Sequence, residues 1–281
     1  MAPEFLFDVD DTLVYNQYMY TKAYADFIDF MLEKIKAKPS SRKQSAELME
    51  IVRQTAPRCK GIEEIIETYK MDRTIRDIYS TVHGFNVKGV KDNPQNPYNK
   101  ERVPNAFKKA YLAICNDKRF DCTAHDGEAQ QAYHLGESFH NVKRDVIEGA
   151  EEVLEFLKAK GCRTRIYTCG DLWLQNKKIE VNGFDKYFDK KDQIIVPVKH
   201  NGEIKDYLHG CNPNQTFMVG NSIKSDIAPA VKSGIRAIYF PSATFYSWDD
   251  IKLEEEHRSK VLTIVDLREI IQNYDLLTSL K

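Results

Sequence analysis

Short apolar runs that end in polar residues recur along the chain, and they constrain its fold more than any other feature. The runs cover residues 5–7, 166–167, 194–196, 217–219 and 235–240. Runs of this length are typical of strands that are buried on both faces. Between the later runs, Val153, Leu154 and Leu157 fall on one face of a helix that Gly161 ends. Strands that alternate with helices predict an α/β fold, in which helices cover both faces of a parallel sheet.

Residues 15–145 show a different pattern, with long amphipathic stretches and no clear strand. Tyr24, Phe27, Ile28 and Met31 recur at helical spacing, and apolar residues within 62–69 and 107–112 do the same. Residues 87–102 are rich in Asn, Pro, Gly and Lys, which predicts a loop. We therefore predict a three-layer, Rossmann-like core from residues 1–14 and 146–281. An all-helical cap from residues 15–145 is inserted after the first strand.

Three carboxylates follow the first apolar run. They are Asp8, Asp10 and Asp11, within the segment 8–13. Ligands of parallel α/β sheets bind at the carboxyl ends of the strands, so these groups are expected to lie at the site. Their mutual repulsion needs a cation to offset it, and a hard ion with oxygen ligands such as Mg²⁺ is the natural partner. Asp8 and Asp10 are two residues apart, so both side chains can face one cavity.

Polar residues also follow three later apolar runs. Thr168 and Gly170 follow the second run, and a hydroxyl next to a glycine suits donation to a phosphate oxygen. Lys199 follows the third run and can neutralise phosphate charge. Asp226 comes shortly after the fourth and can complete a metal site. Singly, these residues also fit helix caps or a solvated lysine. Their shared position at strand ends favours a single site.

This ordered set resembles the haloacid dehalogenase superfamily, specifically its phosphatase branch with a helical C1-type cap. The resemblance covers residues 3 to about 248 and is closest from Gly149 onward. There it is carried by segment 168–171 with Gln175, Lys178 and Gly183, and by segment 218–222 with Ser225, Asp226 and Pro229. The pair Val103 and Pro104 resembles the cap of the same subgroup.

The resemblance implies a role for each strand-end residue. Asp8 is the nucleophile that forms an aspartyl-phosphate, and Asp10 protonates the leaving oxygen and later activates water. Thr168 binds the phosphate, and Lys199 orients Asp8 and the phosphate. Asp8, the backbone carbonyl of Asp10, and Asp226 hold Mg²⁺. Asp11, Thr12, Cys169 and Gly170 are further implied to contribute to the phosphate site.

Three features depart from the pattern of the family. Asn221 stands where many relatives carry Asp, and we expect it to take part in the metal site by bonding a metal-bound water. Cys169 replaces a Lys that often follows the Thr, which leaves open an inert or an oxidation-sensitive thiol. The cap is longer than a minimal four-helix cap. Lys205 is the alternative to Lys199, which we prefer because it directly follows the strand.

Composition bounds the partners and the compartment. Lys plus Arg number 41 and Asp plus Glu 42, so no basic field favours a nucleic-acid polymer. No run approaches the roughly 20 apolar residues that a membrane span needs. The N-terminus shows no signal-peptide pattern. None of the six cysteines forms a C-x-x-C pair, which favours reduced thiols and a cytoplasmic protein.

The sequence thus predicts a cytoplasmic, Mg²⁺-dependent phosphatase that hydrolyses a small phosphorylated metabolite. Two alternatives use the same fold. A phosphotransferase or phosphomutase shares the site but passes the phosphoryl group to a second hydroxyl, and a non-catalytic binding module is the other. Substrate identity and oligomeric state stay open at this level.

Overall fold

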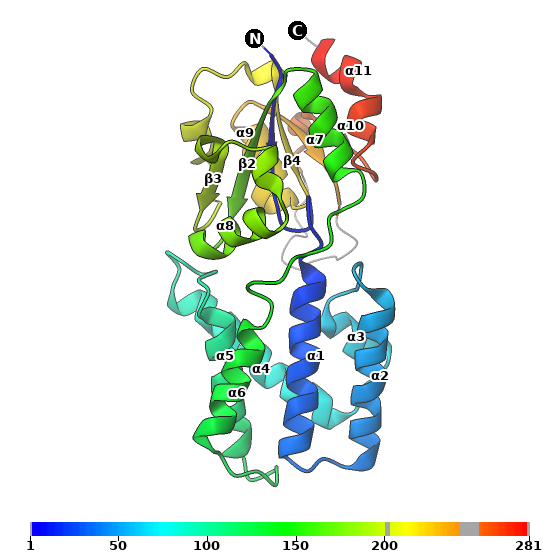
Figure 1. The fold of residues 1–281 in the computed structure, drawn as a ribbon, viewed down its shortest axis with the longest axis vertical. Coiled ribbons are helices and arrows are strands. Elements are labelled where there is room, and N and C mark those ends of the chain that lie inside the picture. Colours follow the sequence, from blue (N-terminus) through cyan, green and yellow to red (C-terminus); the bar gives the residue numbers. More distant parts are fainter. Residues whose placement is uncertain (1, 200–202, 242–252, 280–281) are drawn as a thin grey trace. The chain divides into compact units, whose positions relative to one another are not determined.

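The computed structural model describes residues 2–199, 203–241 and 253–279 (Figure 1). The chain forms two compact units. One combines Met1–Tyr15 with Lys143–Lys281, and the other is Asn16–Val142. The second unit is therefore an insertion into the first, entering after the first strand of the sheet and returning before the helix that precedes the second.

The first unit is built on a parallel sheet whose strand order is β3-β2-β1-β4-β5-β6. The strands are β1 (Glu4–Phe7), β2 (Arg163–Cys169), β3 (Gln193–Val196), β4 (Thr216–Gly220), β5 (Arg236–Tyr239) and β6 (Val261–Thr263). The chain builds outward from β1 to β3, then crosses back to β4 on the other side of β1. Ligands of such sheets bind where the strand order reverses, at the carboxyl ends of the strands. That point lies between β1 and β4.

Helices cover both faces of this sheet (Figure 1). Phe5 and Phe7 pack with residues of α7 (Ala150–Ala159) and α10 (Glu269–Gln272). Leu6 faces the other side and packs with residues of α9 (Ala228–Lys232). All of β1 is buried, as its apolar run predicts. The predicted α/β fold with a Rossmann-like core is confirmed, and β6 is a strand that the apolar pattern did not predict.

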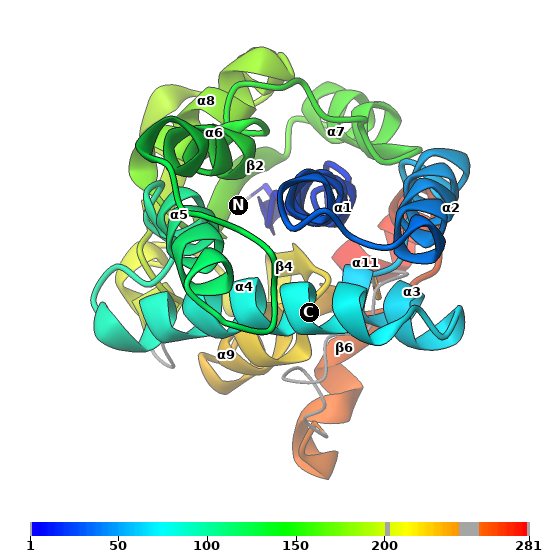
Figure 2. The ribbon, with the colours of Figure 1, turned by 90° about the horizontal axis from the view of Figure 1, so that it is seen from below.

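The second unit, all of whose residues are described, holds helices and no strand. They are α1 (Gln17–Lys34), α2 (Pro39–Thr55), α3 (Ile62–Thr68), α4 (Arg73–Asp92), α5 (Arg102–Cys115) and α6 (Asp126–Glu137). In Figure 2, α1 is seen end-on and α4 lengthwise, so α4 crosses the direction of α1. The predicted helical face of α1, with Phe27, Ile28 and Met31, lies fully in the core of this unit.

The loop predicted over residues 87–102 is wrong in its first part, because α4 continues to Asp92. Turns cover 94–98, and α5 begins at Arg102. Gly89 lies within α4, where the absence of a side chain leaves space for Arg102. A Cβ at that position would lie 3.1 Å from Cγ of Arg102. Tertiary packing therefore outweighs the weak helix propensity of this stretch.

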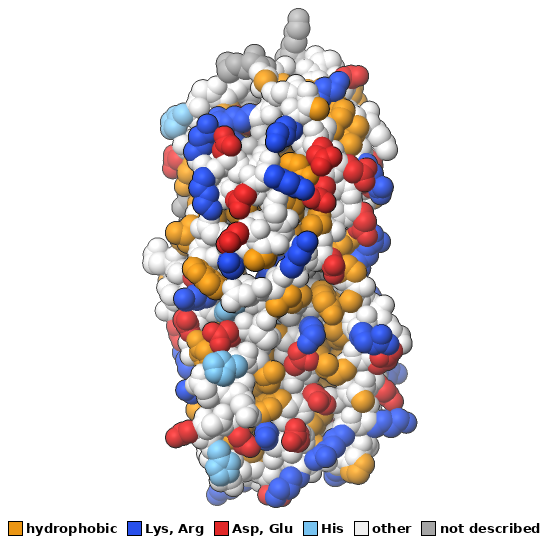
Figure 3. Space-filling model, viewed as in Figure 1, with side chains coloured by type: hydrophobic (Ala, Val, Ile, Leu, Met, Phe, Trp, Pro, Cys, Tyr) orange, Lys and Arg blue, Asp and Glu red, His pale blue; other side chains and the backbone are white. Residues whose placement is uncertain are grey.

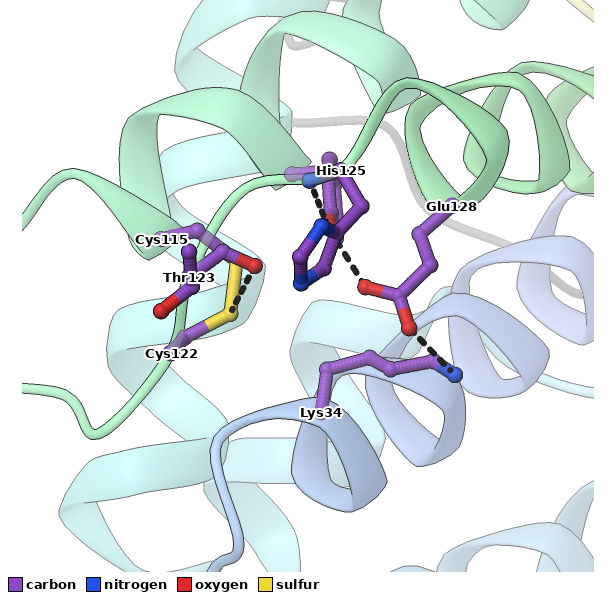
Figure 4. The surroundings of a disulfide bond; sticks show 7 residues. Lys34, Cys115, Cys122, Thr123, His125 and Glu128 are labelled. Carbon is purple, nitrogen blue, oxygen red and sulfur yellow. Dashed lines mark hydrogen bonds and ion pairs between the residues drawn. A yellow bond between two sulfur atoms is a disulfide. The ribbon is translucent and has the colours of Figure 1, made fainter.

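A disulfide joins Cys115, the last residue of α5, to Cys122 in the loop before α6 (Figure 4). The prediction of six reduced thiols is wrong for this pair, and the other cysteines, Cys59, Cys162, Cys169 and Cys211, are free. Nearby, Lys34 of α1 pairs with Glu128 of α6 at 3.0 Å. The disulfide removes part of the support for a cytoplasmic protein, which stays a prediction.

The surface carries mixed charge. On the face drawn in Figure 3, basic and acidic side chains are interspersed, in keeping with a net charge of −1. Within the described part of the chain, no helix combines the length and the apolar character needed to cross a membrane.

Candidate active site

The turn after β1 brings Asp8 to the carboxyl edge of the sheet. The Asp8 N–H donates to the Val219 carbonyl at 2.9 Å, which fixes the end of β1 against β4. Leu13 N–H donates to the Val9 carbonyl at 2.9 Å, which closes the turn. Asp11 adopts φ of +56° within it. Asp8, Asp11 and Thr12 are buried, so the acidic cluster predicted from the sequence is an internal feature of the fold.

Lys199 joins two of the predicted site carboxylates. Its Nζ lies 2.6 Å from Oδ1 of Asp8 and 2.5 Å from Oδ1 of Asp226, and its side chain is only 2% exposed. Burial alone would lower the pKa of Lys199, but attraction by Asp226 and Asp8 outweighs it and raises that pKa. Lys199 is therefore a fixed cation between the strand ends. The alternative, Lys205, is exposed in the short 3-10 helix Glu203–Tyr207.

Asp8 is held in an environment that resists ionisation. Burial raises its pKa to about 7, the contact with Lys199 opposes that rise, and Asp226 and Asp10 add to it. Oδ2 of Asp8 has no hydrogen-bond partner among the described residues. A divalent cation bound to Asp8 would favour its ionised form at neutral pH.

A π-helical turn, Ile223–Ile227, carries Asp226. Such turns often occur at functional sites, because the extra residue re-aims a side chain. Oδ2 of Asp226 accepts from the Ser222 N–H at 3.0 Å, and Ser222 itself caps the turn. Gly220, at the end of β4, leaves the space that the Asp226 side chain fills. A Cβ at Gly220 would lie 2.5 Å from Cβ and Cγ of Asp226.

We expect Gly220→Ala to destabilise the protein by about 1–3 kcal/mol and to displace Asp226, because neither backbone nor side chain can yield cheaply. Urea denaturation measures the free energy of unfolding. Gly84→Ala is the matched control: nothing lies within 4 Å of that Cβ in α4, so we expect a stabilisation of up to about 1 kcal/mol. Equal effects of the two substitutions would contradict this account of Gly220.

Thr168 and Cys169 end β2 beside Asp8. The Thr168 hydroxyl has no hydrogen-bond partner among the described residues, although the residue is 1% exposed. It is therefore available to donate to an oxygen of a ligand. Gly170 N–H donates to the Val196 carbonyl at 2.9 Å and thus holds the loop to β3. Burial, reinforced by nearby Asp8, raises the pKa of Cys169 to about 12 despite Lys199. This favours an inert, protonated thiol over a reactive one.

The Asp10 carboxylate has two partners from α8 (Leu172–Val181), both of which carry the family resemblance but had no role predicted from the sequence. Lys178 Nζ contacts Oδ1, and Gln175 Nε2 donates to Oδ2 at 3.0 Å. Burial would raise the pKa of Asp10, but Lys178 foremost, with Arg144 and Gln175, holds it below its usual value. The available signal was a glutamine and a lysine three residues apart on the buried face of this helix.

The oxygen donors at this edge suit a hard divalent cation. Carboxylates come from Asp8 and Asp226, and Asp10 and Asn221 add carbonyl and amide oxygens, the donor type that Mg²⁺ prefers. The Asn221 amide oxygen accepts from the Thr12 hydroxyl at 3.3 Å, which ties it to the turn after β1. The unpartnered Oδ2 of buried Asp8 gives a cation a place to bind. The predicted residues thus fit a metal, with Asp10 using its side chain elsewhere.

Among the described residues, one group of His, Cys, Asp or Glu side chains places three ligand atoms within 4.8 Å of one another. It consists of Glu254, Glu256 and His257 and lies away from the strand ends, at the surface. Exposed acidic groups of this kind are common without a metal, so it does not compete with the site at β1 and β4.

Residues 5–234 match the family model described as haloacid dehalogenase-like hydrolase. The chain belongs to this hydrolase family. The predicted membership of the haloacid dehalogenase superfamily is thereby confirmed. No curated protein gives a significant match to the chain.

Solved structures share the fold of this haloacid dehalogenase-like hydrolase. A family hydrolase from Xanthomonas campestris superposes with a TM-score of 0.64 at 19% identity, over 99% of this chain and 92% of that one. YfnB from Bacillus subtilis, a HAD-hydrolase candidate bound to magnesium, gives 0.51 at 17%, over 99% of both chains. The L-2-haloacid dehalogenase from Xanthobacter autotrophicus gives 0.52 at 11%, over 98% of both. At these identities the likeness shows the fold alone.

Proposed function

We propose that this hydrolase is a Mg²⁺-dependent phosphatase that cleaves a small phosphomonoester through an aspartyl-phosphate on Asp8. The observation that carries the proposal is the Asp8–Lys199–Asp226 contact at the switch point of the sheet. Asp10, two residues after the nucleophile, can pass a proton to the alkoxide leaving group; because its pKa is held below the usual value, it takes that proton from the bound phosphomonoester monoanion. Dehalogenation, which a solved relative's name suggests, releases halide and has no use for that proton.

The reaction has two steps that this site can support. Asp8 attacks phosphorus and the bond to the leaving oxygen breaks, while Asp10 gives that oxygen its proton. Water then attacks phosphorus of the aspartyl-phosphate, Asp10 takes its proton, and Asp8 is released as a carboxylate. Lys199 and the Thr168 hydroxyl neutralise and bind the phosphate oxygens. Mg²⁺ held by Asp8, Asp226 and the Asp10 carbonyl, with Asn221 bonding its water, would supply the charge that screens attack on a dianion.

The second unit has its own role in this proposal. We assign residues 1–14 and 146–281 to the catalytic core and 15–145 to a C1-type cap that excludes bulk water during the reaction. A small phosphorylated metabolite in the cytoplasm is the proposed substrate. The support is the insertion of an all-helical unit immediately after the turn that carries Asp8 and Asp10.

A substrate panel tests the proposal. Purified protein is incubated with phosphomonoesters and with 2-haloacids, each with Mg²⁺ or with EDTA, and inorganic phosphate, halide and phosphorylated products are measured. We expect inorganic phosphate to be released from a phosphomonoester in the presence of Mg²⁺ and not in the presence of EDTA. Halide release that persists in EDTA would identify a dehalogenase, and phosphate that passes to a second hydroxyl would identify a transferase. Inactivity on the whole panel would favour a binding module.

Mg²⁺ affinity should rise with pH across neutrality. The metal-free Asp8 has a pKa raised to about 7, and a cation binds its ionised form. Below about pH 7 protons compete, so affinity should fall by up to about tenfold per pH unit, and it should level off about one unit above the pKa. Isothermal titration calorimetry in buffers of different ionisation enthalpy measures the released proton. Affinity that is constant over this range would contradict the assignment of Asp8 to the metal.

A further inference from the structure

We propose that Lys178 and Gln175 of α8 are positioning residues for proton transfer, which hold the Asp10 carboxylate in its reactive orientation. This inference rests on the proposed function for its chemistry and on side-chain contacts within the core for its geometry. Lys178 binds one oxygen of Asp10 and Gln175 binds the other, so the carboxylate is fixed at both ends. A group gripped at both oxygens has little rotational freedom left.

Gln175 links Asp10 to the end of β2 and the loop after it. Its Nε2 donates both to Oδ2 of Asp10 at 3.0 Å and to the Cys169 carbonyl at 2.8 Å. Gly170 makes this possible: its φ is +139°, and a Cβ there would lie 2.9 Å from Nε2 of Gln175. The end of β2, the loop after it and the turn after β1 are therefore coupled through one amide.

The orientation of that amide has a cost. Oε1 of Gln175 is buried and has no hydrogen-bond partner among the described residues. An unsatisfied buried acceptor destabilises the folded state, so stability alone would favour another residue here. Such local conflicts are expected where function sets the geometry. The Gln175 amide nitrogen donates to Asp10 while the amide oxygen stays without a hydrogen bond among the described residues.

The ion pair between Lys178 and Asp10 also supports a positioning role. The side chain of Lys178 is 6% exposed and that of Asp10 28%. Buried ion pairs are often no more stabilising than well-packed apolar residues, so folding alone does not account for a lysine at this place. The helix is braced to hold it: the Asn182 side chain donates to the Lys178 carbonyl at 2.8 Å and accepts from the Arg144 N–H at 3.2 Å. The hydrogen bonds of Asn182 therefore fix the end of α8 that carries Lys178.

Burst kinetics separate a positioning role from a structural one. p-Nitrophenolate leaves with little need for a proton, so Lys178→Gln should still release about one equivalent in a burst and then slow by about 10²-fold, because water attack depends on Asp10. An alkyl phosphate should show no burst. Lys177→Gln is the control, since Lys177 pairs with Glu180 at 3.0 Å outside the site. It should match the wild type, and Lys178→Arg should recover part of the lost rate.

Two results would overturn the proposal. One is a Lys178→Gln protein with wild-type steady-state turnover, and the other is an equal loss of burst and turnover. If Lys178→Gln fails to fold, Gln175→Leu leaves the ion pair intact and should give a weaker form of the same pattern. A crystal structure of either variant gives a readout without activity: Asp10 should leave its present orientation, and an unmoved Asp10 refutes the inference. A wild-type protein that releases no p-nitrophenolate would instead contradict the proposed function.

Discussion

Asp8→Asn should lower turnover by at least about 10⁴-fold, because an amide cannot attack phosphorus and the covalent route is lost. The substitution keeps the size and shape of the side chain. It also removes a buried acid whose burial raises its pKa to about 7, so the folded state should be at least as stable as that of the wild type. Steady-state phosphate release measures the rate, and thermal unfolding measures the fold.

Asp189→Asn is the matched control for this substitution. Asp189 belongs to the same unit, but its side chain is 74% exposed and pairs with Lys191 alone among the described residues. The same chemical change should there alter turnover by less than about twofold, since exposed pairs contribute little. Turnover by Asp8→Asn within about tenfold of the wild type would show that Asp8 is not the nucleophile.

Lys199→Met should lower turnover by about 10²- to 10³-fold, the second largest loss that we expect. Without the ammonium, the carboxylates of Asp8 and Asp226 face each other with no fixed cation between them, and a phosphate dianion meets more negative charge. Breaking a buried ion pair should also destabilise the fold by about 3 kcal/mol. Turnover at saturating substrate and urea denaturation measure the two effects.

Lys205→Met separates the two candidate lysines. Lys205 is exposed, and among the described residues its side chain makes no ion pair, so its loss should change turnover and stability little. Loss of turnover that follows Lys205 and spares Lys199 would reverse the assignment. Thermal unfolding of both variants shows whether any loss reflects the site or the fold.

The strand ends could be predicted because their signals are local. An apolar run such as 5–7 marks a strand buried on both faces, and the residue that follows it lies at the carboxyl edge wherever the helices pack. That logic places Asp8, Thr168, Lys199 and Asp226 at one edge of the sheet from the sequence alone. β6 has no such signal, because Val261–Thr263 is short and only partly buried.

Other features depend on how side chains pack once the chain has folded. Lys178 and Asp10 are 168 positions apart, and a lysine in an amphipathic helix is ordinarily a surface residue. The Asp226 side chain fills the space left by Gly220. The Cys115–Cys122 disulfide carries no C-x-x-C spacing and depends on how the loop after α5 turns back. These contacts exist only once the fold has formed.

Mass spectrometry of protein quenched with acid during turnover tests the central claim most directly. The wild-type peptide that contains Asp8 should gain the mass of one phosphoryl group, and hydroxylamine should remove it, as expected of an acyl phosphate. The Asp8→Asn protein should show no such adduct. Rapid phosphate release with no adduct on Asp8, or with the adduct on another residue, would contradict the account.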